Sequence, residues 1–185
     1  MTRLMIVVGS VRPVRAGVPV AEWVRARAEA HGGFDVDYAD LKEIGLPLMD
    51  EPNHPRLHEY THAHTIAWSE RVAAADAFVF VTPEYNHSFS PALKNALDYL
   101  SAEWWRKPVG FVSYGGASGG SRGVAVLAST VQSLGLVRTG SNIEIGFIGT
   151  RIVDGEFAAQ EKEEAILGNM LAELPALSDA LRPLR

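Results

Sequence analysis

Five short runs of apolar residues recur along the chain, and they constrain its fold more than any other feature. Each run is nearly continuous in hydrophobicity, which is typical of strands buried on both faces of a sheet. Longer segments with helical periodicity separate the runs, which cover residues 4–8, 34–38, 77–82, 109–114 and 136–145. Short strands that alternate with helices predict an α/β fold with a parallel sheet covered on both faces.

The segments between the runs predict five helices. Residues 18–30 place apolar side chains on one face and charged side chains on the other, as in a surface helix. Ser90 is expected to cap the third helix with Pro91 at its first position, and Pro175 is expected to lie just beyond the last helix. The predicted helices cover residues 18–30, 55–75, 91–100, 124–134 and 156–174.

Length and composition limit the kinds of protein that this chain can be. A chain of 185 residues fits one domain, so residues 1–185 are expected to fold together. A net charge of −5 argues against a nucleic-acid partner, because gripping phosphates takes a clustered excess of Lys and Arg. The chain has no cysteine, so any redox chemistry must come from a bound cofactor.

The apolar runs are also too short for a membrane span, which needs about 18 consecutive apolar residues. The first run, residues 4–8, is likewise too short for the core of a signal peptide. We therefore expect no membrane partner and a cytoplasmic location.

Ligands of doubly wound sheets bind outside the carboxyl ends of the strands, so we expect the functional residues in the loops there. The first loop, residues 9–17, brings together Gly9, Ser10, Arg12 and Arg15 and leads straight into a helix. A glycine, a hydroxyl, two guanidinium groups and the free amides of a helix N-terminus all favour a phosphate. The alternative is that both arginines are solvated loop residues.

Two later loops have the small and aromatic residues that suit a flat ligand. After the third run, Pro83 ends the strand and places Tyr85 and Asn86 on the ligand side. A tight turn with a surface tyrosine is the alternative for the same residues. The fourth run leads into the loop of residues 113–120, where four glycines let a planar ring lie against the backbone. A merely flexible loop is the alternative for that segment.

Taken together, these segments resemble the NADPH-dependent FMN reductase family, whose relatives include chromate, quinone and azo-dye reductases. The resemblance rests on the GSxRxxR loop at residues 9–15, on PEYNxS at 83–88 followed by LKNAxD at 93–98, and on YGG at 114–116. It implies a flavodoxin-like fold, a three-layer doubly wound five-stranded parallel sheet with strand order 2-1-3-4-5, as a single FMN-binding domain.

The family pattern implies a role for residues in all three loops. The FMN phosphate is expected to be held by Gly9, Ser10, Arg12, Arg15 and Gly17. The ribityl chain and isoalloxazine edge are expected to meet Pro83, Glu84, Tyr85 and Asn86. The other side of the site is expected to be closed by Ser113, Tyr114, Gly115 and Gly116. No side-chain acid or base is required, so no catalytic residue is assigned, and Lys94, Asn95 and Asp98 are read as structural or interfacial.

The resemblance also implies an activity and partners. An FMN-dependent oxidoreductase would take electrons from NADPH or NADH and pass them to a small acceptor, either a quinone, an azo compound, a metal oxyanion or free flavin. Family members commonly form dimers or tetramers, so a homodimer or homotetramer is expected. A non-enzymatic FMN-binding electron carrier is the alternative, although Arg12 and Arg15 fit the reductases better.

Two rival motifs point to hydrolases. His58, Glu59 and His62 match HExxH, in which histidines one helical turn apart bind zinc, and His54 and His64 enrich the neighbourhood. A polar helix face is the simpler interpretation, so no metal ligand is assigned. Residues 116–120 match the GxSxG nucleophile elbow, but every histidine precedes Ser118, which the order of that catalytic triad forbids.

Overall fold

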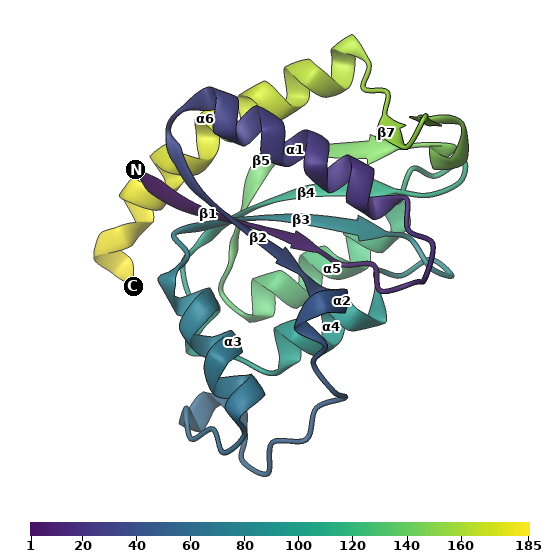
Figure 1. Cartoon of the computed structure of the whole chain (residues 1–185). Helices are drawn as coiled ribbons and strands as arrows, with labels where there is room; N and C mark the ends of the chain where they lie inside the picture. Colours follow the sequence, from purple (N-terminus) through teal and green to yellow (C-terminus); the bar gives the residue numbers. More distant parts are fainter.

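A five-stranded parallel sheet forms the centre of the computed structural model, which describes residues 1–185 (Figure 1). Its strand order is β2-β1-β3-β4-β5, which confirms the predicted order 2-1-3-4-5. The three inner strands are buried almost throughout, as their continuous hydrophobicity predicted. The strands are β1 (Thr2–Val8), β2 (Phe34–Asp40), β3 (Ala77–Pro83), β4 (Pro108–Tyr114) and β5 (Val137–Ile145).

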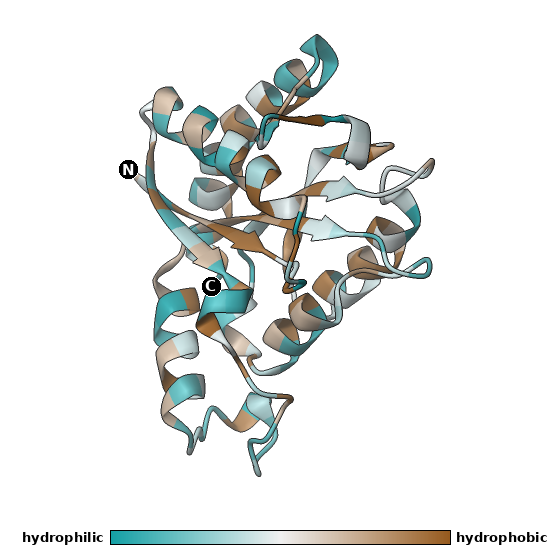
Figure 2. Ribbon diagram, turned by 45° about the vertical axis from the view of Figure 1, so that its right-hand side comes forward, coloured by the Kyte–Doolittle hydropathy of each residue, from teal (hydrophilic) through white to brown (hydrophobic).

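Helices cover both faces of the sheet and give the molecule three layers (Figure 1). One face packs against α1 (Gly17–His31) and α6 (Glu161–Leu181). The other packs against α3 (Ala63–Ala74), α4 (Pro91–Asp98) and α5 (Ser121–Ser133). Successive strand residues point to opposite faces, so each inner strand contributes to both apolar layers, and brown strands lie between helices of mixed colour in Figure 2.

Local sequence signals placed several helix ends correctly. The Ser90 hydroxyl accepts a hydrogen bond from the Leu93 N–H, and Pro91 opens α4 as expected. Gly32 and Gly135 follow α1 and α5 in the left-handed conformation, with φ of 72° and 77°. Both glycines end their helices because they adopt positive φ without a Cβ clash.

The prediction of one helix over residues 55–75 was wrong. A short 3-10 helix, η1 (Pro55–Leu57), is followed by an irregular segment, and α3 begins only at Ala63. His58 has a φ of 55°, which no α-helical residue adopts. The Glu51 carboxylate accepts hydrogen bonds from the N–H groups of Thr61 and His62, at 2.9 and 3.0 Å, and so holds this segment in its irregular form.

The prediction for the C-terminal segment was also wrong at both ends. Residues 152–157 form a small hairpin from β6 (Ile152–Val153) and β7 (Glu156–Phe157), turned by Asp154 and Gly155 at positive φ. Helix α6 then begins at Glu161 and continues through Pro175 to Leu181. Pro175 removes one helical hydrogen bond, but Leu171, Leu174 and Ser178 are buried on either side of it, and that packing maintains the helix.

Short elements that the sequence analysis did not predict complete the fold. They are α2 (Leu41–Ile44), η2 (Ala102–Trp104), η3 (Ile148–Thr150) and η4 (Arg182–Leu184). No helix in the structure combines the length and the apolar character that crossing a membrane requires.

Candidate functional site

A cavity of about 220 Å³ opens at the carboxyl ends of β1, β3 and β4, where all three predicted loops meet. Eight of the thirteen predicted residues line it: Ser10, Arg12, Arg15, Pro83, Glu84, Tyr85, Tyr114 and Gly115. The sequence analysis did not assign three further lining residues, Val14, Ala16 and Ile148. Five predicted residues do not line the cavity: Gly9, Gly17, Asn86, Ser113 and Gly116.

The loop after β1 presents free backbone donors to this cavity. No backbone N–H group of residues 10–18 donates a hydrogen bond to another part of the chain, and no side chain caps the start of α1. The Arg12 guanidinium beside them is exposed and has no ion-pair partner. Unpaired N–H groups, the positive end of a helix dipole and a free cation together form an anion site.

Arg15 has a different position from Arg12. Its Nη1 donates to the Asp40 carboxylate at 2.6 Å and to the Ser10 carbonyl at 3.0 Å. The hydrogen bond to Asp40, whose side chain is only 5% exposed, raises the Arg15 pKa above its ordinary value. Arg15 therefore braces the loop against the end of β2 while its side chain still borders the cavity.

Tyr114 ends β4 with its phenol oxygen buried and without a hydrogen-bond partner. Burial raises its pKa above the ordinary value, and the nearby Ser10 side chain, which lies outside good hydrogen-bond geometry, opposes this only in part, so the hydroxyl stays protonated as a donor. The oxygen reaches the start of α1 because Gly17 has no side chain: a Cβ there would lie 2.4 Å from it. The structure thus gives Gly17 a packing role beneath the predicted phosphate loop.

Tyr85 links the first and second loops. Its hydroxyl lies 3.3 Å from the Ser10 Oγ, and its backbone pairs with Ser88 through hydrogen bonds of 2.8 and 2.9 Å. Asn86 and His87 form the exposed tip of that turn, with φ of 48° and 66°. Two successive positive φ values define a type I′ turn, which asparagine tolerates. The segment is therefore a tight turn, and of the two residues predicted to face the ligand Tyr85 lines the cavity while Asn86 does not.

The Glu84 carboxylate is committed to the start of α5. Its side chain is 5% exposed, and it pairs with the Arg122 guanidinium at 2.5 Å. It also accepts hydrogen bonds from the Ser118 hydroxyl and the Arg122 and Gly123 N–H groups. Burial opposes ionisation, but these donors outweigh it and lower the Glu84 pKa. Glu84 thus joins the second loop to the third.

Two predicted residues are held inside the protein. The Ser113 hydroxyl is buried and donates to the Gly119 carbonyl at 2.9 Å, with the Ile143 carbonyl 3.3 Å away. The Gly9 N–H donates to the Val81 carbonyl at 2.8 Å, and the Gly9 carbonyl accepts from the Ser90 hydroxyl. Both residues fix the backbone from which the loops emerge.

The third loop is open on its outer side. A Cβ added to Gly116 would meet no atom within 4 Å, whereas one on Gly115 would approach Gly120 and Glu84. The N–H groups of Phe147 and Ile148 donate to the carbonyls of Gly116 and Gly115. The chain after β5 therefore forms one wall of the cavity, through contacts between residues 31 and 33 positions apart that no local pattern predicts.

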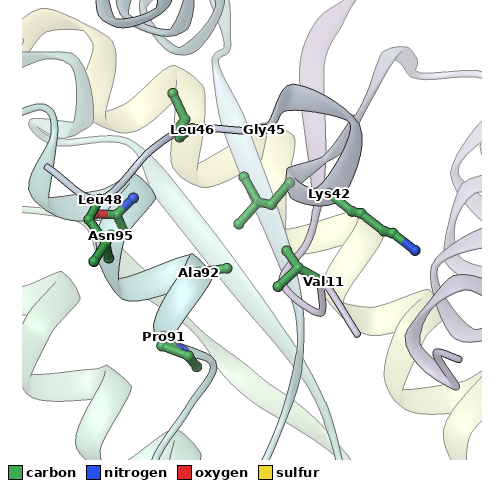
Figure 3. A pocket seen from close by; sticks show the side chains of 9 residues that line it. Val11, Lys42, Gly45, Leu46, Leu48, Pro91, Ala92 and Asn95 are labelled. Atoms are coloured by element: carbon green, nitrogen blue, oxygen red, sulfur yellow. The ribbon is translucent and has the colours of Figure 1, made fainter. Parts of the chain in front are cut away.

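A second cavity, of about 350 Å³, lies beside the first loop (Figure 3). Val11, Leu48 and Ala92 border it with other mostly apolar residues. The Asn95 amide fastens its rim, since it donates to the Pro47 carbonyl and accepts from the Met49 N–H. The sequence analysis gave Asn95 a structural or interfacial role, and these hydrogen bonds are structural.

The HExxH segment does not have the geometry of a zinc site. Its residues precede α3, so His58 and His62 are not one helical turn apart on a helix. The His58 ring contacts the Glu103 carboxylate at 3.2 Å, whereas His62 and His64 stack on each other and contact Asp50. No cluster of three or more His, Cys, Asp or Glu side chains in the structure could hold a metal ion.

Comparison with known proteins identifies relatives of this chain by sequence. The family model described as NADPH-dependent FMN reductase matches residues 2–146. An NAD(P)H-dependent FMN reductase of Schizosaccharomyces pombe is 43% identical over 120 residues, which span 64% of this chain and 60% of that protein. An NADPH azoreductase of a Bacillus species is 34% identical over 146 residues, 77% of each chain.

Solved structures share the fold. A flavoenzyme NAD(P)H:(acceptor) oxidoreductase from Paracoccus denitrificans superposes with a TM-score of 0.76 and 20% identity, covering 98% of this chain and 99% of that one. An azoreductase from Bacillus anthracis gives a TM-score of 0.59 and 17% identity, with 97% and 100% covered. At such identities the likeness concerns the arrangement of helices and strands.

Proposed function

The chain belongs to the NADPH-dependent FMN reductase family, and from this premise we propose that it binds FMN at the β1, β3 and β4 edge and passes electrons from NADPH or NADH to a small acceptor. The observation that carries the proposal is the set of unpaired backbone N–H groups in residues 10–18 beside the free Arg12 guanidinium. These donors suit a phosphate monoester, which is dianionic near neutral pH.

The residues of the site fit FMN in two further respects. The buried Tyr114 hydroxyl lacks a hydrogen-bond partner beside Gly17, and a polar ligand atom in the cavity is the group that would satisfy it. Tyr85 and Gly115 border the cavity, and Gly116 leaves space beyond it, so a planar ring can lie against an aromatic side chain and bare backbone.

When bound, FMN would supply the hydride chemistry that no side chain of this cysteine-free chain provides. The chain itself would hold and orient the cofactor. Ser10, Arg12 and the loop amides would bind the phosphate, Arg15 would keep the loop in place through Asp40, and Glu84 would hold the third loop through α5. Asn86, Ser113, Gly9 and Gly17 would act through the backbone they shape.

The acceptor that we propose is a small molecule: a quinone, an azo compound, a metal oxyanion or free flavin. Relatives named FMN reductases, azoreductases and quinone oxidoreductases support the flavin, azo and quinone acceptors. The electron-carrier alternative predicts FMN binding without accelerated NADPH oxidation.

A visible absorbance spectrum of the purified protein tests the proposal, recorded before and after anaerobic addition of NADPH. Flavin bands that bleach, with steady NADPH oxidation once quinone is added, would support it. A protein that takes up no added FMN would refute it. FMN uptake without accelerated NADPH oxidation would instead support the carrier. Stoichiometric zinc in untagged protein would revive the hydrolase interpretation.

We also propose that residues 1–185 form one domain that assembles as a homodimer or homotetramer in the cytoplasm, where nicotinamide nucleotides are available. Val11 and Leu48 beside the second cavity are 41% and 84% exposed, and apolar exposure of this kind supports association. Light scattering tests the assembly, with Leu48→Lys as the perturbing variant. A monomer at micromolar concentration would refute it.

A further inference from the structure

A third cavity, of about 690 Å³, lies at the amino ends of the strands, opposite the edge that the three loops occupy. Lys107, which directly precedes β4, and Ala73, in the last turn of α3, are part of its lining. None of the residues assigned to FMN contributes to it. We propose that this cavity binds a small planar aromatic carboxylate, held by Arg56 and Lys107 and packed against Trp105.

The charges around the cavity favour an anion. Arg56 is exposed and forms no ion pair, so its guanidinium is available to a ligand. The Lys107 ammonium, in a side chain 7% exposed, donates to the Val72 and Ala73 carbonyls at 2.9 Å each. An ammonium has three protons, so one of them remains without an oxygen acceptor, and apart from the two carbonyls the ammonium has only the Phe78 ring nearby, with the ring centre 5.8 Å from the Nζ.

The one acidic side chain that lines the cavity is already paired. The Glu103 carboxylate accepts hydrogen bonds from the hydroxyls of Tyr60 and Ser69, at 2.8 and 2.6 Å, and contacts the His58 ring. The third cation of the lining, Arg185, faces Asp76 at 3.4 Å. Because Glu103 and Arg185 already have partners, Arg56 and the third Lys107 proton remain available to a ligand. A carboxylate can accept hydrogen bonds from both.

Trp105 supplies an apolar wall. Its side chain is 47% exposed, whereas the other three tryptophans are buried to 8% exposure or less. The indole stands over Gly135, where an added Cβ would lie 2.2 Å from the ring, and the Arg106 guanidinium lies 5.2 Å from the ring centre. These contacts keep the exposed indole in one orientation, so it offers a ready surface for an aromatic ring.

The ring and the carboxylate must belong to one molecule for all of these residues to be used. An inorganic anion would leave Trp105 exposed, and a neutral aromatic would leave Arg56 and the Lys107 proton unmatched. The cavity volume lies within the range of about 300–1,000 Å³ that is usual for small-molecule sites.

Isothermal titration of FMN-saturated protein with benzoate tests the proposal, with benzyl alcohol and acetate as matched probes that lack the charge or the ring. We expect benzoate to bind at least about tenfold more tightly than either, without changing the flavin absorbance spectrum. Iodide quenching of tryptophan fluorescence, which reports chiefly on the exposed Trp105, should fall as benzoate binds.

Variants locate the binding. Arg56→Gln, at an exposed position, should weaken benzoate binding at least about threefold, and Trp105→Leu at least about fivefold. Arg3→Gln is the matched control, because Arg3 is exposed, lies at the same end of the sheet and does not line the cavity. Equal affinity in all four proteins, equal binding of the three probes, or a benzoate-dependent change in the flavin spectrum would overturn the proposal.

Discussion

Replacing Tyr114 with phenylalanine should raise the stability of the FMN-free protein and lower its affinity for FMN. The substitution keeps the buried ring, which is 5% exposed, and removes only a hydroxyl that has no hydrogen-bond partner. A buried polar group without a partner destabilises the folded state by about 1–3 kcal/mol. We therefore expect the free energy of unfolding to rise by about 1–2 kcal/mol in the FMN-free variant.

The effect on FMN has the opposite sign. If a polar atom of the cofactor satisfies the Tyr114 hydroxyl, its loss removes a hydrogen bond worth about 0.5–1.5 kcal/mol net, or roughly a two- to tenfold weaker affinity. Urea unfolding at several FMN concentrations measures both quantities, since ligand bound to the folded state adds RT ln(1 + [L]/Kd) to the free energy of unfolding.

Gly17→Ala tests the same contact from the other side. The new Cβ would lie 2.4 Å from the Tyr114 hydroxyl oxygen but 3.2 Å from the nearest ring carbon. Overpacking should therefore lower the free energy of unfolding of Gly17→Ala by about 1–3 kcal/mol, and by much less when Tyr114→Phe has removed the oxygen. A double-mutant cycle should give a coupling of about 1 kcal/mol or more. The reasoning fails if Tyr114→Phe destabilises the FMN-free protein by more than about 1 kcal/mol, the net value of a formed hydrogen bond. Unchanged FMN affinity would mean that the Tyr114 hydroxyl does not bind the cofactor.

Three further predictions concern charged residues. Arg12→Gln should weaken FMN binding about tenfold or more while leaving the urea midpoint of the FMN-free protein unchanged, because Arg12 is exposed and unpaired; equal affinity in a fluorescence titration would contradict the phosphate assignment. Glu84→Gln should remove stability that the wild type has above pH about 4.3 and loses in acid, since the folded-state pKa of Glu84 is lowered; parallel pH–stability curves would contradict this. Burial lowers the Lys107 pKa to about 8, so between that pH and the unfolded value of about 10.4 the unfolded state binds more protons and stability rises with pH. That rise, about 3 kcal/mol, should be absent from Lys107→Met, and an equal rise in both proteins by thermal unfolding would refute the burial argument.

Residues close together in the sequence determined the sheet and the positions of its ligand loops. Apolar runs predicted all five main strands, but burial on both faces was right only for the three inner strands, because the edge strands β2 and β5 include polar and partly exposed residues. Ser90 and Pro91 placed the start of α4, since capping involves residues within one turn. The loop at residues 9–17 could be read as an anion site because free amides and a nearby cation are local properties.

Contacts between distant residues decided the rest, and local patterns do not contain them. Glu51 holds the chain ahead of α3 from ten residues away, which removes the helix that HExxH required. Helix α6 passes through Pro175 because side chains on both sides of it are buried, and burial outweighs one lost hydrogen bond.

The individual roles of the site residues also depended on tertiary structure. Arg12 and Arg15 read alike in the sequence, but Asp40, at the end of β2, engages only Arg15. The sequence leaves the Glu84 carboxylate free to face a ligand, whereas in the folded chain it pairs with Arg122 at the start of α5. Sequence alone indicated eight of the eleven residues that line the cavity at the sheet edge. Only the folded chain decided which of them already have partners, because a partner is supplied by whichever distant segment packs alongside.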